Sequence, residues 1–195
     1  MLKIIRTSFS MLIIWSILTG LVYPLVVTGI AQTLFPFESN GSLLFNDEGT
    51  PIGSRLLGQA FDLPGYFWGR PSATSPFPYN ATASSGSNLG PLNPLLEEQV
   101  AASVRRLKDV DSKNHDSVPV DLVTASASGL DPDISVAAAR YQIPRIARAR
   151  HLKSEVLLKL LEQVSVQQNP FLWREARVNV LELNLALDRL KPHGE

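Results

Sequence analysis

The longest apolar stretch of the chain stands near its N-terminus. Residues Thr7–Phe37 contain no charged side chain, and their centre reads SMLIIWSILTGLVYPLVVTGIAQTLF. An α-helix rises about 1.5 Å per residue, so about 20 apolar residues cross the roughly 30 Å of hydrocarbon in a bilayer. The stretch therefore predicts one transmembrane helix over about residues 9–34. Pro24 is tolerated inside such a helix when the hydroxyls of Thr19 and Thr28, or a neighbouring helix, bond the carbonyls that proline leaves free.

The flanking charges indicate how this helix is oriented. Lys3 and Arg6 precede the span, so the positive-inside rule places the N-terminus in the cytoplasm and the rest of the chain outside. A cleaved signal peptide is the alternative, but the run is longer than the roughly 7 to 15 residues of a signal core and lacks a clean A-x-A site. We therefore expect an uncleaved anchor in residues 1–37 and an extracytoplasmic domain in residues 38–195. With 16 cations against 18 anions, that domain has a formal charge of −2.

Beyond the span, short apolar runs alternate with turn-forming residues. Ser42–Phe45 and Ile52–Leu57 flank a turn-rich segment and predict a hairpin. Residues 58–94 are rich in Gly, Pro, Ser, Asn and aromatic side chains, and their prolines exclude a long regular element. Because disordered linkers are poor in aromatic residues, we interpret this segment as an ordered surface loop of the length that usually serves a function.

The second half of the chain predicts a mixture of helices and strands. Asn93 and Pro94 are suited to begin a helix, as cap and first residue, and Leu96, Val100, Val104 and Leu107 share one face of it. Val118–Ala125 predicts a strand. Helical patterns follow at Ser135–Tyr141 and Glu155–Val164, with a turn from Pro144 to Arg150 between them. Val178–Leu185 predicts a half-buried strand that passes into helix towards Asp188. The fold class is therefore α+β: a single transmembrane helix followed by one mixed α/β domain.

Composition excludes several classes of function. Among 195 residues, 18 Lys and Arg balance 18 Asp and Glu, so the excess of cations that nucleic-acid binding requires is missing. The absence of cysteine excludes disulfides, thiolate metal sites and cysteine nucleophiles. His115, His151 and His193 are far apart and lack neighbouring carboxylates, so we expect no metal site.

Two serines and four arginines are the remaining candidates for chemistry. Ser126 and Ser128 lie in a turn without the G-x-S-x-G pattern, and we expect them to cap the helix that follows or to bond turn backbone rather than to act as nucleophiles. We therefore predict no catalytic residue. A basic cluster could face a partner, a phosphate, anionic lipid or simply solvent; it consists of Arg140, Arg145, Arg148 and Arg150.

A serine- and glycine-rich segment, Ala83–Gly90, has the composition of loops that cradle phosphate with backbone N–H groups. It lacks the G-x-x-x-x-G-K-[ST] pattern, and it contains no lysine to bind the terminal phosphates of a nucleotide. A tight turn that leads to the Asn93 cap explains the composition equally well.

From end to end, these motifs resemble the C chain of the Kdp potassium-transporting P-type ATPase. The resemblance rests on segments spread along the chain: Leu57-Gly58-Gln59, Tyr66-Phe67, Gly69-Arg70-Pro71-Ser72-Ala73, Tyr79-Asn80, Ser84–Leu89, Asn93-Pro94, Val118–Asp131, Gln142–Ala147 and Val178–Asp188.

The resemblance implies an accessory, non-catalytic subunit of an ATP-driven potassium uptake pump in the bacterial inner membrane. Its partners would be a channel-like potassium-binding subunit and a P-type ATP-hydrolysing subunit, whose ATP affinity it would raise as a catalytic chaperone. No firmly bound cofactor is implied, and ATP would be met through the complex. The family's proposed nucleotide segment corresponds to Ser84, Gly86, Ser87 and Asn88. As residues that contact the partner subunits, we expect Arg70, Tyr66, Phe67, Arg145 and Arg148.

Because the flanking charges place the loop outside and ATP is cytosolic, we favour a domain that covers the outer face of the channel-like subunit. A membrane-anchored extracytoplasmic enzyme and a directly nucleotide-binding regulator remain the alternatives.

Overall fold

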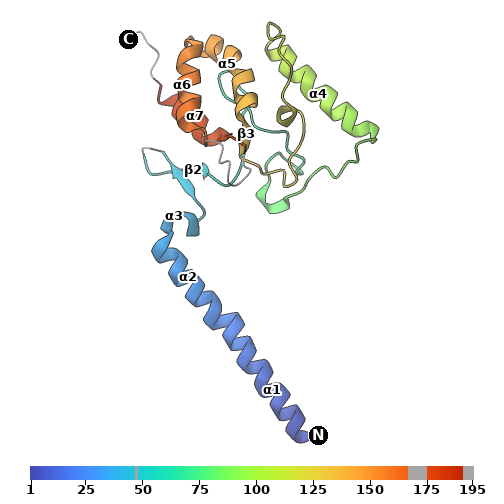
Figure 1. Cartoon of the computed structure of the whole chain (residues 1–195), viewed down its shortest axis with the longest axis vertical. Helices are drawn as coiled ribbons and strands as arrows, with labels where there is room; N and C mark the ends of the chain where they lie inside the picture. The colour runs from blue at the N-terminus through green and yellow to red at the C-terminus, as the bar shows by residue number, and fades with distance from the viewer. Residues whose placement is uncertain (47, 167–174, 191–195) are drawn as a thin grey trace. The chain divides into compact units, whose positions relative to one another are not determined.

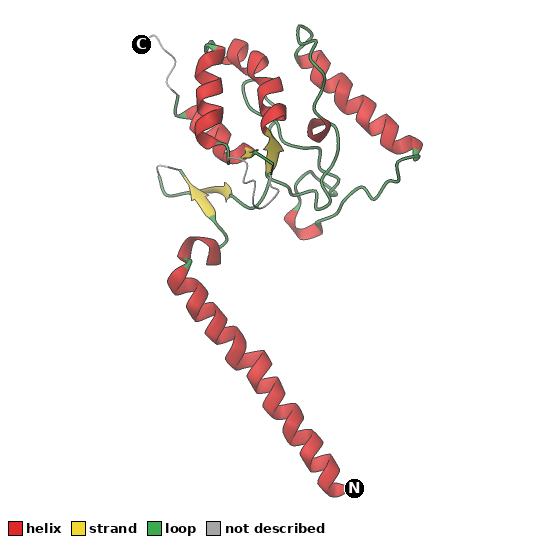
Figure 2. Ribbon diagram, in the orientation of Figure 1, coloured by secondary structure: helices red, strands yellow, loops and turns green. Residues whose placement is uncertain are grey.

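The computed structural model of the chain describes residues 1–46, 48–166 and 175–190 (Figure 1). It divides into two compact units, Met1–Ile52 and Gly53–Glu195. The α+β prediction is confirmed, because one N-terminal apolar helix is followed by further helices and two small sheets (Figure 2). Asp47 of the predicted hairpin turn and His193 lie outside the described residues.

The first unit begins with a continuous helical run, Leu2–Leu34. It consists of α1 (Leu2–Ile17), a π-helical turn (Leu18–Val22) and α2 (Tyr23–Leu34). The run is 33 residues long with a window of mean hydropathy 2.0, and none of that window is buried. Its length and composition suit a membrane span, and the predicted span of about 9–34 lies within it.

The π-helical turn stands directly before Pro24. Proline has no N–H to donate to the carbonyl one turn earlier. The N–H of Tyr23 instead bonds the carbonyl of Leu18, five residues back, and widens the helix locally. The Thr19 hydroxyl donates to the Trp15 carbonyl at 2.7 Å, which is not a carbonyl that Pro24 frees, because proline frees the carbonyl of Gly20, four residues before it.

A short helix and a hairpin follow the long helix. α3 (Pro36–Ser39) leads into β1 (Leu43–Phe45), which pairs with β2 (Pro51–Ser54). The Asn46 side chain accepts from the N–H of Thr50 at 2.8 Å and thereby holds the turn. The predicted hairpin is confirmed, although its second strand ends at Ser54 rather than Leu57.

Two strands and four helices organise the second unit. These are α4 (Pro94–Val110), β3 (Asp133–Ser135), α5 (Val136–Arg150), α6 (Ser154–Val164), β4 (Arg177–Asn179) and α7 (Val180–Asp188). β3 and β4 are antiparallel, with Ile134 opposite Val178. Each strand runs directly into a helix: Ser135 caps α5 by accepting from the N–H of Ala138, and Asn179 caps α7 by accepting from the N–H of Glu182.

The two predicted strands need correction. Val118–Ala125 is no strand; it contains a 3-10 turn, Val120–Leu122. Its Pro119 cannot donate to a ladder, and Val120 is 70% exposed. Val178–Leu185 is strand only as far as Asn179, because the Asn179 side chain accepts from the Glu182 N–H in the first turn of α7 and so caps a helix there.

The turn expected at Pro144 is also wrong. α5 continues through this residue to Arg150. Pro144 frees the carbonyl of Arg140, and Arg140 is exposed, so water can bond that carbonyl. The helix ends one residue later at His151, whose φ of 56° is left-handed.

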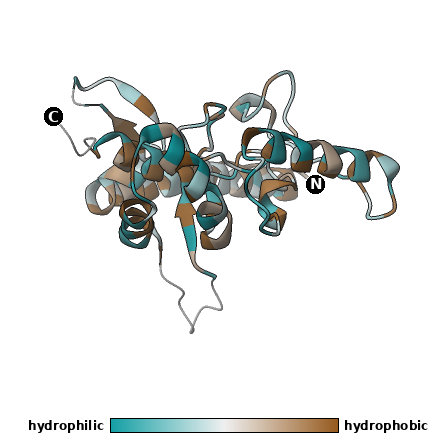
Figure 3. Ribbon diagram, turned by 90° about the horizontal axis from the view of Figure 1, so that it is seen from above, coloured by the Kyte–Doolittle hydropathy of each residue, from teal (hydrophilic) through white to brown (hydrophobic). Residues whose placement is uncertain are grey.

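The predicted helices at 94–107 and 155–164 are confirmed by α4 and α6. Leu107 of α4 is buried, and the other three residues of its predicted inner face are half-buried. Figure 3 shows hydrophilic and hydrophobic stretches side by side on this helix. The core that it joins is formed mainly by α5, α6 and α7, and includes Phe67, Leu122, Ile134, Ile146, Leu157, Leu161, Val178, Leu183 and Leu187.

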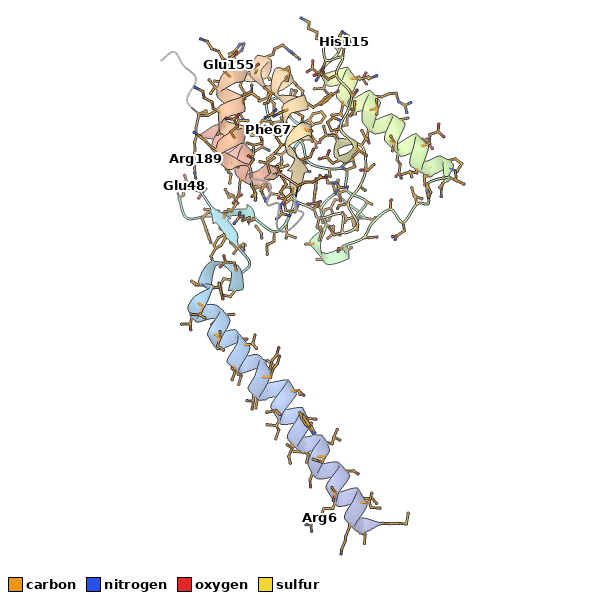
Figure 4. All side chains as sticks on the ribbon, viewed as in Figure 1. Arg6, Glu48, Phe67, His115, Glu155 and Arg189 are labelled. Atoms are coloured by element: carbon orange, nitrogen blue, oxygen red, sulfur yellow. The ribbon has the colours of Figure 1, made fainter. Side chains whose placement is uncertain are left out.

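The loop residues Phe67 and Trp68 pass through this core without a strand partner. Phe67 is fully buried, and Figure 4 labels it inside the unit. The Asn184 amide of α7 accepts from the Phe67 N–H and donates to its carbonyl, both at 2.9 Å. The Gln142 amide of α5 does the same for Trp68, at 2.8 and 3.1 Å. We call these four bonds the amide clamp; they satisfy backbone groups that water cannot reach.

We expect Asn184→Leu to lower the free energy of unfolding of the full chain in detergent by about 2–5 kcal/mol, because it leaves two buried backbone groups of Phe67 unpaired. Urea unfolding followed by tryptophan fluorescence measures this. Gln99→Leu, which replaces an exposed amide on α4, is the control and should stay within about 0.5 kcal/mol. Equal stability of the two variants would contradict the role of the clamp.

Candidate functional site

The candidate partner surface is built around residues 61–70, which we call the aromatic loop. Arginines from two helices, α4 and α5, hold this loop. Arg145 of α5 donates to the carbonyls of Pro64 and Tyr66 and to the Gln142 side chain. Its guanidinium carbon lies 4.5 Å from the centroid of the Trp68 ring, and that of Arg106 from α4 lies at the same distance. The indole therefore links α4 and α5 through cation–π contacts.

Arg145 is almost completely buried, with 5% of its surface exposed. Burial lowers the pKa of its guanidinium to about 10; Asp111 opposes this shift, whereas Arg106 and Arg148 add to it. The group stays protonated at neutral pH and bonds carbonyl oxygens of the loop. Its environment makes Arg145 a structural support of the loop.

Tyr66 is fixed by a second arginine. The Arg150 guanidinium carbon lies 4.4 Å from the Tyr66 ring, and Arg150 Nε donates to the Gly65 carbonyl at 2.7 Å. Both Arg150 and the Tyr66 hydroxyl donate to the carboxylate of Asp188, at 2.6 and 3.2 Å. The half-buried Tyr66 ring therefore has a defined orientation at the surface.

Arg70 connects the aromatic loop to the segment after Leu122. It donates to the Asp131 carboxylate at 3.1 Å and to the Ala125 carbonyl at 3.3 Å. The Arg70 carbonyl accepts from the Tyr79 hydroxyl at 2.6 Å. Burial raises the pKa of Tyr79 to about 12, and Asp131 adds to this shift, because both disfavour the phenolate.

Arg148 is the most exposed of the predicted interface arginines. Its side chain is 47% exposed and pairs with Oδ1 of Asp111, which is 4% exposed. Asp111 Oδ2 and the Tyr141 hydroxyl are buried without a partner among the described residues. Asp111 ends α4, so this ion pair fastens the C-terminal end of α4 to α5.

The predicted nucleotide segment lies against the turn that contains Ser126 and Ser128. The Ser84 hydroxyl and the Ser85 N–H both donate to the Ser128 carbonyl at 3.0 Å. A Cβ on Gly86 would lie 2.8 Å from the Ala127 carbonyl oxygen, so only glycine fits there without a shift. Ser87 is half-buried and Asn88 is exposed. The Ser85 N–H is thus occupied within the chain.

Ser126 and Ser128 bond turn backbone, as predicted. The Ser126 hydroxyl accepts from the Gly129 N–H at 2.9 Å, and the Ser128 hydroxyl accepts from the Leu130 N–H at 3.1 Å. Gly129 has a φ of +67°, which a side chain rarely adopts. Both hydroxyls therefore shape the turn.

A pocket of about 230 Å³ opens between the aromatic loop and α4. Its walls combine apolar and aromatic side chains with Arg70, Ser72 and Arg106. These three polar side chains have partners within the chain: Arg106 pairs with Asp62, which also lines the pocket, Arg70 pairs with Asp131, and the Ser72 hydroxyl donates to the Gly129 carbonyl. Among these lining residues we find no nucleophile beside a base. The described residues also contain no group of three or more His, Cys, Asp or Glu side chains that could hold a metal ion.

The structure brings together some of the predicted residues and separates others. Tyr66, Phe67, Arg70 and Arg145 belong to one region around the aromatic loop. Arg148 of α5 instead pairs with Asp111 at the C-terminal end of α4, and residues 84–88 lie on the 126–129 turn. Phe67 and Arg145 face inward, and Tyr66, Arg70 and Arg148 keep exposed surface. Sequence reasoning missed Gln142 and Asn184; the signal was an amide at an apolar position of a helical pattern.

Comparison with known proteins adds a consistent result. The family model described as K+-transporting ATPase, c chain, matches residues 5–189. A protein of Herpetosiphon aurantiacus named Potassium-transporting ATPase KdpC subunit is 56% identical over 186 residues, which make up 95% of this chain and 96% of the relative. A protein of the same name from Polaromonas naphthalenivorans is 55% identical over 192 residues, or 98% of this chain and 97% of the relative.

We expect the Tyr79 hydroxyl to make the stability of the chain depend on alkaline pH. The folded state raises the phenol pKa from 10.0 to about 12, so its stabilising effect is complete below pH 10 and is lost as the pH rises to 12. Unfolding of the wild type and of Tyr79→Phe should therefore differ most below pH 10 and converge towards pH 12. Tyr23→Phe, in the helix of the other unit, is the control; a difference independent of pH would contradict this assignment.

Proposed function

The chain belongs to the family of the K+-transporting ATPase C chain, and we propose that it serves its pump as an accessory subunit that stabilises the complex and raises the ATP affinity of the hydrolysing subunit. Its partners in this proposal are the channel-like potassium-binding subunit and the P-type ATP-hydrolysing subunit. The match of the family over residues 5–189 is the observation that carries the proposal.

The helix Leu2–Leu34 supports a role as membrane anchor. It contains one run of apolar residues, and between Thr7 and Leu34 no ionisable group other than the Tyr23 phenol. A single span whose apolar run contains no carboxylate or cation has no relay for ions or protons of its own. We propose that it crosses the bacterial inner membrane once, with a cytoplasmic N-terminus, and packs against helices of the partner subunits.

The second unit supports a binding role rather than a reaction. Arg70, Arg145 and Arg150 bond carbonyls, carboxylates and an aromatic ring of the same unit, and together they fix the surface of the aromatic loop. We propose that Tyr66, Arg70 and Arg148 contact the outer face of the channel-like subunit. Phe67 and Arg145 would contribute by holding the loop in shape from within.

An extracytoplasmic unit can change ATP affinity only through the conformation of the pump. If it binds one pump state more tightly than another, it shifts the population towards that state, and the nucleotide site on the other side of the membrane responds. The occupied Ser85 N–H is consistent with this indirect route, since that group is not free to bond a phosphate.

We expect removal of residues 38–195, with Met1–Phe37 kept, to reduce both recovery of the assembled pump and potassium-stimulated ATP hydrolysis. Co-purification and phosphate release in membranes measure the two effects. Restored activity on co-expression of the full chain is the control for expression of the partner subunits. Unchanged assembly together with unchanged hydrolysis would refute the accessory role.

The orientation is tested separately. Alkaline phosphatase fused after Glu195 should be active, because that enzyme requires the oxidising space outside the cytoplasmic membrane. A green fluorescent protein fusion at the same position should be dark when exported through the general secretion route. Activity of the second reporter alone would place the unit in the cytosol and favour direct contact with nucleotide.

A further inference from the structure

The segment before and at the beginning of α4 exposes an unusual amount of apolar surface. Residues 90–95, Gly-Pro-Leu-Asn-Pro-Leu, are all exposed, and we call them the leucine tip. Leu92 is 95% exposed and Leu95 48% exposed. Single exposed leucines are ordinary, but here two leucines and two prolines stand together.

The leucine tip has a fixed conformation. The Asn93 N–H donates to the Gly90 carbonyl at 3.0 Å, and the Asn93 side chain accepts from the Leu95 N–H at 3.0 Å. Pro91 and Pro94 restrict their own φ angles. Because little conformational entropy remains to be lost, such a segment is well suited to binding.

The tip stands away from the core of its unit. α4 has a single buried residue, Leu107, close to its C-terminal end. The ion pair of Arg148 with Asp111 and the contact of Arg106 with Trp68 also hold that half of the helix. Figures 1 and 3 both show the other end of α4 projecting away from α5, α6 and α7.

The charges beside the leucine tip argue against some classes of partner and favour another. Glu97, in the first turn of α4, and the next residue, Glu98, are both exposed. Anionic lipid headgroups would repel them. A second copy of the chain, docked tip to tip, would bring the same carboxylates together. A protein recess with an apolar floor and a basic rim satisfies both the leucines and the carboxylates.

We propose that the leucine tip docks into an apolar recess with a basic rim on the channel-like subunit. The inference rests on the proposed function, since it assumes that the second unit meets that subunit. It adds the residues that make the contact, Leu92 and Leu95 as anchors and Glu97 and Glu98 as the charged flank.

Photocrosslinking in the assembled pump tests the contact. Benzoylphenylalanine is placed at position 92 of the full chain, with position 158 as the control, because Leu158 lies on α6 and is 36% exposed. Position 92 should crosslink to the channel-like subunit and position 158 should not. Crosslinks from position 92 only to lipid or to a second copy, or none at all, would overturn the proposal.

A third probe separates failure of the tip from failure of the proposed function. Phe77, in the loop segment after the aromatic loop, is 56% exposed. A crosslink from position 77 to the channel-like subunit without one from position 92 would refute the tip and leave the function standing. If neither position reacts in a purified complex, the tip is refuted, and the deletion of residues 38–195 decides the proposed function.

Substitution measures the contribution of the tip. Leu92→Glu with Leu95→Glu should lower the amount of channel-like subunit that co-purifies by about tenfold, and Leu158→Glu should leave it unchanged. Both substituted positions are exposed, so the unit should keep its fold, which its thermal unfolding would verify. Glu97→Lys with Glu98→Lys should lower the crosslinking yield from position 92. Full recovery of the complex in the double leucine variant would contradict the inference.

Discussion

The second unit depends on satisfying the backbone of Phe67 and Trp68 inside the core. A loop that enters a core has no neighbouring strand to pair its N–H and carbonyl groups, and each buried unpaired group is costly. Asn184 and Gln142 supply both a donor and an acceptor to one residue each, as a neighbouring strand would. The amide clamp thereby joins α5, α7 and the aromatic loop, and the order of the whole candidate surface follows from it.

The arginines extend this arrangement outward. Arg145 bonds the loop from within, Arg150 orients Tyr66, and Arg70 connects the loop to Asp131. Three arginines of the basic cluster, Arg145, Arg148 and Arg150, thus bond groups of the same unit, whereas Arg140 is exposed. A rigid surface lowers the entropic cost of binding, and under the proposed function this is what the framework of arginines would contribute.

The two ends of α4 differ in how firmly they are attached to the rest of the unit. Its C-terminal end is attached through Leu107, Arg106 and the ion pair of Asp111 with Arg148, while its N-terminal end carries exposed leucines on a capped turn. Apolar surface that a chain does not cover by itself, but holds in one conformation, is typical of an interaction site. Because the chain belongs to a family of pump subunits, the assembled pump contains other subunits for this surface to contact.

The sequence by itself determined the features that depend on local chemistry. The long uncharged run predicted the anchor helix, Asn93 with Pro94 predicted the beginning of α4, and motifs spread along the chain indicated the family. The tertiary structure alone decided that Val118–Ala125 is no strand, that α5 continues through Pro144, and that Phe67 and Arg145 face inward. The reason is distance along the chain: the partners that satisfy Phe67 and Trp68 lie 117 and 74 residues away, and no local pattern contains that information.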